Sequence, residues 1–266
     1  MIPACFVRRR GEGALLVLVH GVAGSALIWS DVVDRLADRY ELLAVDLLGY
    51  GHSPKPRIDY TADAHIAAIH NGIAPIVGER PVVLVGLSMG SLLALTYAAS
   101  GLADVRGIVA LGAPYYRDEA EARLGLRANA WTSLCLRAPL LARPLINVTW
   151  GLGRRSRWLS TRMRPAIYAP EIARETMMAT YHAFSSSTRE VLVQARIEPL
   201  LDATSSIPKL FVHGTADPWC PAERIEELVR DRSDCTLTVL EGIGHNLAVL
   251  EPARVAALLS AFTPAP

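Results

Sequence analysis

The residues with the clearest chemical potential form a G-x-S-x-G motif, Gly-Leu-Ser-Met-Gly, at positions 86–90. An apolar run at 81–85 precedes the motif, and an apolar segment rich in small residues follows at 91–99. A buried strand that turns through this motif into a helix exposes the serine as a nucleophile, because the glycines permit the tight turn. The helix start also favours developing negative charge. A plain Gly-Ser turn is the alternative, and the flanking pattern favours a nucleophilic Ser88.

A serine hydroxyl is a weak nucleophile, so it needs a base to take its proton and an acceptor to orient that base. One of the chain orders known for such residues is Ser, then Asp or Glu, then His. Asp217 follows an apolar run at 209–212, and His245 follows another at 235–240. Both are expected at the carboxyl edge of a parallel sheet, where sites form. The alternative acid, after a run at 105–111, is disfavoured because no carboxylate occurs there before Asp118.

Strand and helix patterns alternate around these residues, which predicts an α/β fold with a doubly wound, mostly parallel sheet. One short N-terminal strand is expected near residues 5–8. The other expected strands are residues 14–19, 40–45, 82–85, 105–111, 209–212 and 235–240, and the expected helices are residues 26–37, 61–77, 91–99, 222–229 and 247–262.

The alternation stops after residue 114. Residues 115–201 show no clear strand pattern and combine arginines, aromatics and helix formers with several prolines. We therefore predict a core made of residues 1–114 and 202–266, with residues 115–201 inserted as a helical cap, or lid. This segment is called the insertion below.

Two further segments accompany the candidate residues: His-Gly-Val-Ala-Gly-Ser at 20–25 and Asp-Leu-Leu-Gly-Tyr-Gly-His-Ser at 46–53. Together with the serine motif and the loops that carry Asp217 and His245, they resemble α/β-hydrolase-fold proteins with a single helical cap. The resemblance covers essentially the whole chain, and the insertion is its least matched part. Three histidines in family-like turns, His20, His52 and His213, are expected to be structural.

The resemblance implies a role for each candidate. Ser88 would be the nucleophile, His245 the general base and then the general acid, and Asp217 the residue that holds the imidazole. The backbone N–H groups of Val22 and Met89 would form the oxyanion hole, where such donors contribute about 3–4 kcal/mol each to transition-state binding.

The insertion, which we expect to cover Ser88, also supplies candidates for the substrate pocket. Tyr115, Trp150 and His182 from the insertion, and Trp219 beside the predicted acid, are expected to bind substrate. The other aromatic residues of the insertion are further pocket candidates, although most of the aromatic set is expected to form the core of a small helical layer and two or three to contact substrate: Tyr116, Trp131, Trp158, Tyr168, Tyr181 and Phe184.

Five arginines crowd into residues 154–164. A mouth for an anionic substrate, such as a CoA thioester or a free acid, is one interpretation of the Arg154–Arg164 cluster. A solvated helix face is the other, and it is favoured here.

The amino-acid composition and net charge exclude some classes of function. At 266 residues, with 51% hydrophobic and 20% charged residues, the chain predicts one large globular domain or a domain with an insertion. A net charge of +1 argues against nucleic acid as a partner. No signal peptide is expected and no apolar run reaches membrane-spanning length, so no membrane partner is expected. The four cysteines lack paired spacing, which predicts free thiols in a reducing cytoplasm and no metal site. The basic residues are almost all Arg, with only Lys55 and Lys209 as lysines, which is a compositional hint of a bacterial source.

The sequence thus predicts a cofactor-free serine hydrolase that acts on a small carboxylic ester, thioester or lactone through an acyl-enzyme. Its partner would be a small-molecule substrate, with an acyl group on CoA or a carrier protein as a second option. The same triad could instead serve elimination or C–C bond cleavage. A ligand-sensing protein with little turnover is the third interpretation.

Overall fold

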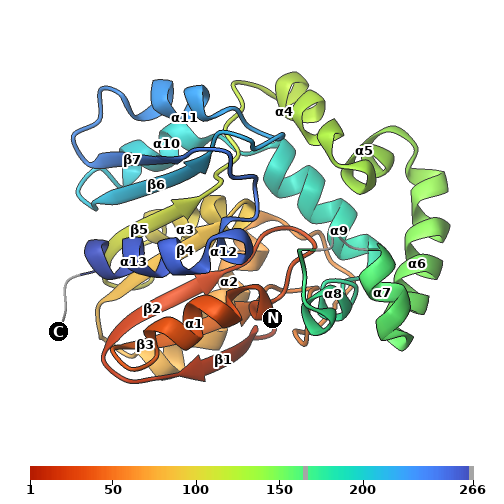
Figure 1. Ribbon diagram of the computed structural model, residues 1–266, viewed down its shortest axis with the longest axis horizontal. Coiled ribbons are helices and arrows are strands. Elements are labelled where there is room, and N and C mark those ends of the chain that lie inside the picture. Colours follow the sequence, from red (N-terminus) through yellow and green to blue (C-terminus); the bar gives the residue numbers. More distant parts are fainter. Residues whose placement is uncertain (164–166, 264–266) are drawn as a thin grey trace.

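The computed structural model describes residues 1–163 and 167–263, which fold around a seven-stranded sheet (Figure 1). The strand order is β1-β3-β2-β4-β5-β6-β7, and every neighbouring pair is parallel except β1 and β3. The doubly wound, mostly parallel sheet that the sequence predicts is therefore confirmed. The strands are β1 (Phe6–Arg10), β2 (Ala14–Val19), β3 (Tyr40–Asp46), β4 (Val82–Leu87), β5 (Val105–Leu111), β6 (Lys209–Gly214) and β7 (Cys235–Leu240).

The central strands are apolar on both faces because helices cover both sides of the sheet. In β2, Leu15, Val17 and Val19 belong to one core cluster, whereas Leu16 and Leu18 belong to the other. Helices α2, α3 and α11 pack on the first face, and α1, α12 and α13 pack on the second. Ser88 and Asp217 therefore follow strands that are buried along their whole length, β4 and β6, whereas β7, which precedes His245, is partly exposed.

The helices of the core follow the predicted ranges with local differences. Thr61 caps α2 by accepting a hydrogen bond from Ala64 N, as expected. The helix expected at 247–262 is instead two helices, because Pro252 lacks an N–H and begins a new one. The core helices are η1 (Ala26–Trp29), α1 (Ser30–Leu36), α2 (Ala62–Val77), α3 (Met89–Ala99), α11 (Ala222–Val229), α12 (Leu247–Leu250) and α13 (Pro252–Phe262).

Between β5 and β6, the described residues form helices and no strand. Most of these helices lie together at one side of the sheet, and α6 and α7 lie farthest from it (Figure 1). The last helix, α10, packs against α3 instead. The segment comprises α4 (Glu119–Gly125), η2 (Leu126–Ala128), α5 (Ala130–Arg137), α6 (Pro139–Arg155), α7 (Arg157–Met163), α8 (Pro170–Glu175), α9 (Tyr181–Ser187), a π-helix (Thr188–Val193) and α10 (Ile197–Ala203).

Candidate active site

Ser88 occupies a sharp turn between β4 and α3. Its backbone has φ 56° and ψ −122°, a left-handed conformation that costs a non-glycine residue roughly 1–3 kcal/mol. The flanking glycines leave no room for a side chain. A Cβ at Gly86 would lie 2.2 Å from Gly90 O, and a Cβ at Gly90 would lie 2.1 Å from Val19 O. The close approach of backbones therefore forces the turn that presents Ser88 at the sheet's carboxyl edge.

Asp217 and His245 meet at the same edge, in the loops that follow β6 and β7. His245 Nδ1 lies 2.6 Å from Asp217 Oδ2, and Trp219 N donates to Asp217 Oδ1 at 2.9 Å. Burial raises the pKa of Asp217, but the hydrogen bond and charge of His245 outweigh it, and the pKa lies below its ordinary value. An ionised Asp217 thus fixes the His245 ring with Nδ1 protonated and Nε2 free to accept a proton.

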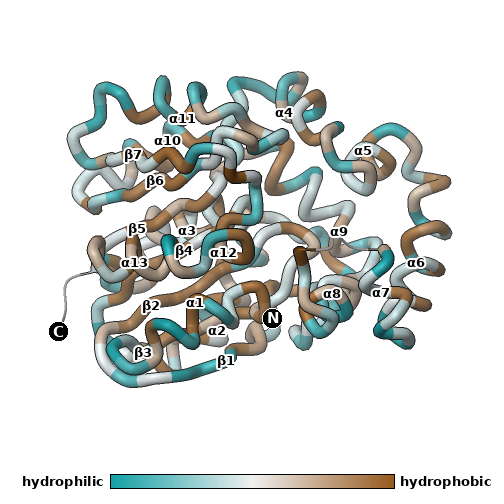
Figure 2. The backbone as a smooth tube through the Cα atoms, in the orientation of Figure 1, coloured by the Kyte–Doolittle hydropathy of each residue, from teal (hydrophilic) through white to brown (hydrophobic). Residues whose placement is uncertain are grey.

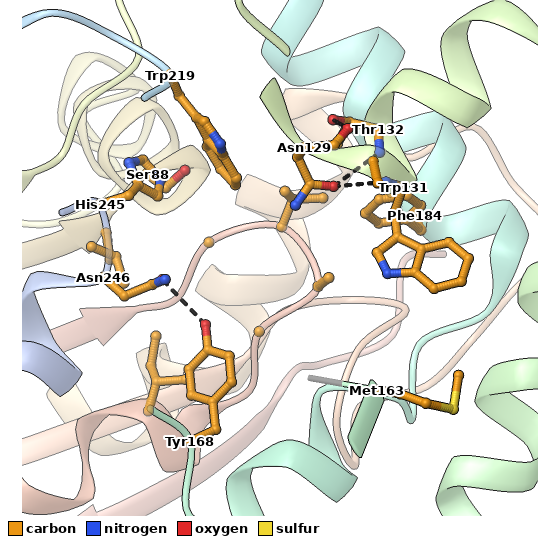
Figure 3. A pocket seen from close by; sticks show the side chains of 17 residues that line it. Ser88, Asn129, Trp131, Thr132, Met163, Tyr168, Phe184, Trp219, His245 and Asn246 are labelled. Carbon is orange, nitrogen blue, oxygen red and sulfur yellow. Dashed lines mark hydrogen bonds between the residues drawn. The ribbon is translucent and has the colours of Figure 1, made fainter. Parts of the chain in front are cut away.

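Ser88 and His245 line the same cavity, and they lie side by side in it (Figure 3). Ser88 Oγ and His245 Nε2 are both buried, and neither has a hydrogen-bond partner among the described residues. Buried polar atoms are normally paired, so two unpaired atoms facing one cavity mark a place for a reacting molecule. Gly21 closes the wall, since a Cβ there would lie 3.0 Å from Ser88 Cβ.

The loop after β2 is held in place by His20. Its Nε2 accepts the N–H of Leu47 at 3.0 Å, so Nδ1 carries the proton and donates to Gly21 O at 2.7 Å. Burial lowers the pKa of His20, which keeps the ring neutral as this bonding requires. His20 is structural, as the sequence predicts, and it aligns the Gly21–Val22 peptide beside Ser88.

Asp46 and His213 hold the neighbouring loops. Asp46 accepts Ala26 N at 2.7 Å and His52 N at 2.8 Å, which ties the two motif segments together. His213 Nε2 lies 2.7 Å from Cys220 O, and burial lowers the pKa of the His213 ring. The neutral ring therefore holds the loop that carries Asp217 in place, which is the structural role that the sequence predicts.

The candidate oxyanion donors flank the nucleophile. Val22 lines the cavity at the end of the β2 loop. Met89 is the first residue of α3, where a backbone N–H has no acceptor within its own helix. Both N–H groups thus belong to segments that adjoin Ser88.

The cavity has a volume of about 280 Å³, and apolar and aromatic groups form much of its wall. Trp219 stacks beside the base, with its ring centroid 4.1 Å from that of His245. Tyr168 OH lies 3.2 Å from Asn246 Oδ1 on the opposite side of the cavity (Figure 3). Residues 20–30 and 86–90 contribute Gly21, Val22, Ala23, Gly24, Ile28, Leu87 and Ser88, and the remaining wall is Asn129, Ala130, Trp131, Thr132, Met163, Tyr168, Phe184, Trp219, His245 and Asn246.

Of the four residues expected to bind substrate, Trp219 alone lines this cavity. Trp150 lies one layer behind it, packed edge-on against Phe184 at a centroid distance of 5.2 Å. Tyr115 OH bonds Glu198 at 2.7 Å, and His182 Nε2 lies 2.8 Å from Ile58 O. The placement expected for Tyr115, Trp150 and His182 is therefore corrected, because each side chain is engaged elsewhere.

Several lining residues carried little signal in the sequence. Asn129 is recognisable afterwards as the cap of α5, since its side chain accepts Trp131 N and Thr132 N. Met163 and Phe184 have no motif, because their place depends on how the helices of the insertion pack. The described members of the arginine cluster, residues 154–162, are absent from the cavity wall, and Arg164 lies outside the described residues.

The described residues lack two other features. In residues 1–163 and 167–263, no group of three or more His, Cys, Asp or Glu side chains is arranged to hold a metal ion. In the same ranges, no helix has the length and apolar character needed to cross a membrane.

Comparison with known proteins identifies the family. The sequence profile of the "Alpha/beta hydrolase family" matches residues 16–258, so the chain belongs to the alpha/beta hydrolase family.

Hydrolases stand among its relatives and structural neighbours. A 2-(acetamidomethylene)succinate hydrolase of Mesorhizobium japonicum is 34% identical over 129 residues, a match of 48% of this chain and 46% of that protein. A 2-hydroxy-6-oxo-6-(2'-aminophenyl)hexa-2,4-dienoic acid hydrolase of Metapseudomonas resinovorans is 25% identical, over 91% of this chain and 81% of that one. A thermophilic esterase of Thermogutta terrifontis has the same fold, with a TM-score of 0.74, 21% identity, and coverage of 97% and 92% of the two chains.

Proposed function

We propose that this chain is a serine hydrolase that cleaves a small, uncharged carboxylic ester, thioester or lactone through an acyl-enzyme. The observation that carries the proposal is the pair of unpartnered atoms, Ser88 Oγ and His245 Nε2, that line one cavity. Asp217 orients the His245 ring, because Asp217 Oδ2 lies 2.6 Å from Nδ1, the other nitrogen of that ring. Membership of the hydrolase family supports the same conclusion.

The reaction follows from this arrangement. Ser88 Oγ attacks the carbonyl carbon while His245 Nε2 takes the hydroxyl proton, and the carbonyl electron pair moves onto oxygen. When the tetrahedral intermediate collapses, the bond to the leaving group breaks and His245 returns its proton to that group. A water molecule, deprotonated by His245, then attacks the acyl-enzyme, and Ser88 recovers its proton as the acid departs.

The oxyanion of each tetrahedral intermediate would accept the backbone N–H groups of Val22 and Met89. The start of α3 adds its dipole at the same place, which stabilises negative charge there. His20 supports this role indirectly, because its bond to Gly21 O fixes the peptide that precedes Val22.

The insertion serves as the cap in this proposal, with residues 1–114 and 202–266 as the catalytic core. Helices α5, α7 and α9 contribute Trp131, Met163 and Phe184 to the wall above the nucleophile. A volume of about 280 Å³ suits a small acyl group.

The charge carried by the residues of the cavity wall determines which acyl groups we expect to bind. Among the described residues, neither Lys nor Arg lines the cavity. A carboxylate on the acyl group would therefore be buried with no cation from the described residues beside it, which is costly. The two named relatives act, by their names, on carboxylic acids, so we expect this chain to differ from them in preferring an uncharged acyl group.

Mass spectrometry of the intact protein after brief exposure to acyl donors tests the proposal. The panel pairs a butyryl aryl ester with the matching hemisuccinyl aryl ester, and adds a butyryl thioester and a lactone. Wild type, Ser88→Ala and His245→Gln are compared. We expect butyryl adducts on Ser88 and weaker hemisuccinyl adducts in wild type, much slower adduct formation in His245→Gln because His245 also activates Ser88, and none in Ser88→Ala.

Two outcomes would contradict the proposal. A folded wild type that forms no adduct with any donor and does not react with a fluorophosphonate would leave elimination or ligand sensing as the better interpretation. A dominant hemisuccinyl adduct would contradict the uncharged acyl group while retaining the triad.

A further inference from the structure

The outer face of α6 and α7 exposes large apolar side chains in a regular pattern. On α6, Leu141, Leu145, Val148 and Leu152 follow helical spacing and are 47–68% exposed. Trp158 on α7 is 65% exposed beside them in the chain. Monomers rarely display a continuous apolar surface of this kind without a partner. We call these five residues the outer stripe.

The outer stripe is separate from the face that α6 turns toward the protein. The residues of α6 that are buried against the rest of the molecule are Ala142, Ile146, Trp150 and Gly153. Figure 2 shows apolar residues along α6, at the edge of the molecule far from the sheet. The fold therefore accounts for one apolar face of α6 and leaves the outer stripe uncovered.

The segment that carries the outer stripe has charges of one sign, although its Arg157 pairs with Glu171 of α8. Residues 130–163 contain six arginines and no Asp or Glu, whereas the rest of the chain has more acidic than basic residues. Arg137, Arg143 and Arg155 form no ion pair among the described residues. The Arg162 guanidinium lies over the Trp158 ring, 4.7 Å from its centroid.

We infer that this face docks on an anionic lipid bilayer, with α6 lying along the interface. Leucines and a tryptophan enter the headgroup boundary while the arginines reach lipid phosphates, which is the composition of interfacial helices. Charge decides against a second copy of the chain, because a symmetric contact would bring the two sets of arginines together. No described helix spans a membrane, so the contact is peripheral. It replaces the sequence expectation of no membrane partner.

Docking would place the cavity beside the lipid surface. α5 and α7 both pack against α6, and they also supply Trp131, Thr132 and Met163 to the cavity wall. Of the helices that face the bilayer, α7 thus lines the cavity itself, and α6 packs directly against α5, which also lines it. The inference concerns binding alone and does not depend on the proposed hydrolase activity.

Vesicle flotation tests the inference with the intact chain. We expect wild type to float with vesicles of phosphatidylcholine containing one third phosphatidylglycerol, and much less with phosphatidylcholine alone. Each of Arg137→Gln and Arg155→Gln should weaken binding about fivefold at low salt. The double variant Leu145→Gln/Val148→Gln should weaken it at least about tenfold.

Matched variants elsewhere on the surface test whether vesicle binding is specific to the outer stripe. Leu124→Gln, at a leucine 62% exposed on α4, and Arg230→Gln, at an exposed arginine after α11, should leave flotation unchanged. Near-ultraviolet circular dichroism confirms that each variant is folded.

Three results would overturn the inference. One is a folded wild type that stays unbound by anionic vesicles at low salt. The second is equal flotation of the double variant and wild type. The third is a concentration-dependent dimer, by light scattering, that Leu145→Gln/Val148→Gln dissociates, which would make a second copy the occupant.

Discussion

The edge of the sheet that carries Ser88 and the insertion that encloses it are held together by different means. At the sheet edge, backbone contacts fix the nucleophile: Ser88 N donates to Leu111 O at 2.8 Å, and Gly90 touches the backbone of Val19. The insertion is attached mainly through side chains, such as Glu175, which reaches Arg8 at 2.9 Å. Backbone geometry tolerates almost no change, whereas side-chain contacts can be exchanged.

This difference separates the catalytic candidates from the residues that shape the pocket. The strand ends determine where the serine, the acid and the base meet, so a variant there should abolish the reaction or the fold. The helices of the insertion determine what fits beside Ser88, so variants there should alter binding or stability by smaller amounts.

The largest effect is expected from Ser88→Ala. Loss of the nucleophile should lower kcat/KM for an aryl ester by about 10⁴-fold or more, because the base then has no hydroxyl to activate. Ser88→Gly should be equally inactive but about 1 kcal/mol more stable than wild type, since glycine adopts φ 56° without strain. Steady-state kinetics and urea unfolding measure the two effects. Residual activity in both variants near the wild-type level would exclude Ser88 as the nucleophile.

Asp217→Asn should rank next, with a fall in kcat of about 10³–10⁴-fold. The amide cannot balance an imidazolium on His245, and it favours the wrong tautomer of that ring. The same substitution in a Ser88→Ala background should cause almost no further loss, because the residues act as a unit. Independent, additive losses would show that Asp217 acts through something other than His245.

One substitution made in both regions sharpens the comparison. Gly90→Ala should destabilise the fold by about 3 kcal/mol or more, because its Cβ would collide with Val19 O at 2.1 Å. In α6, Gly151→Ala meets nothing closer than 3.8 Å and should stabilise by about 0.5–1 kcal/mol. Urea midpoints at pH 8 measure both. Similar changes in the two variants would contradict a rigid turn at Ser88 beside an adaptable insertion.

The sequence predicts the sheet edge well because its signals are local. A G-x-S-x-G between a strand and a helix leaves few conformations for Ser88, and Asp217 and His245 each follow a strand directly. In a parallel sheet, such strand ends must converge. The pocket is different, because helical spacing does not reveal which face of a helix turns inward. Trp150 and Phe184 both suit a pocket, yet packing places Trp150 behind Phe184.

Glu175 is the clearest side-chain link between the insertion and the core. Its carboxylate is 8% exposed, and Oε1 lies 2.9 Å from Arg8 Nη2 and 3.0 Å from His52 Nε2. Glu175→Gln should destabilise by about 2 kcal/mol, since both partners of the carboxylate are partly solvated and the full cost of a broken buried pair is not reached. Glu171→Gln, whose partner Arg157 is exposed, should cost less than about 1 kcal/mol.

Urea unfolding and esterase assays together locate the effect of Glu175. If the link positions the insertion, KM should rise in Glu175→Gln while kcat stays near wild type. A fall in kcat with KM unchanged would mean that the contact acts on the catalytic core instead.

The smallest expected effect concerns His65, where the two regions meet inside the molecule. His65 on α2 is fully buried, its Nε2 lies 3.0 Å from Ser187 Oγ of α9, and burial lowers its pKa to about 3. The unfolded chain binds a proton near pH 6.5 and the folded chain does not, so stability is complete above that pH and falls toward pH 3. The loss should be about 1 kcal/mol at pH 6 and about 2 kcal/mol at pH 5. His65→Gln should therefore be less stable than wild type at pH 8 yet lose less stability on acidification. Parallel curves for wild type and His65→Gln between pH 8 and pH 5 would show that His65 does not carry the acid sensitivity of this junction.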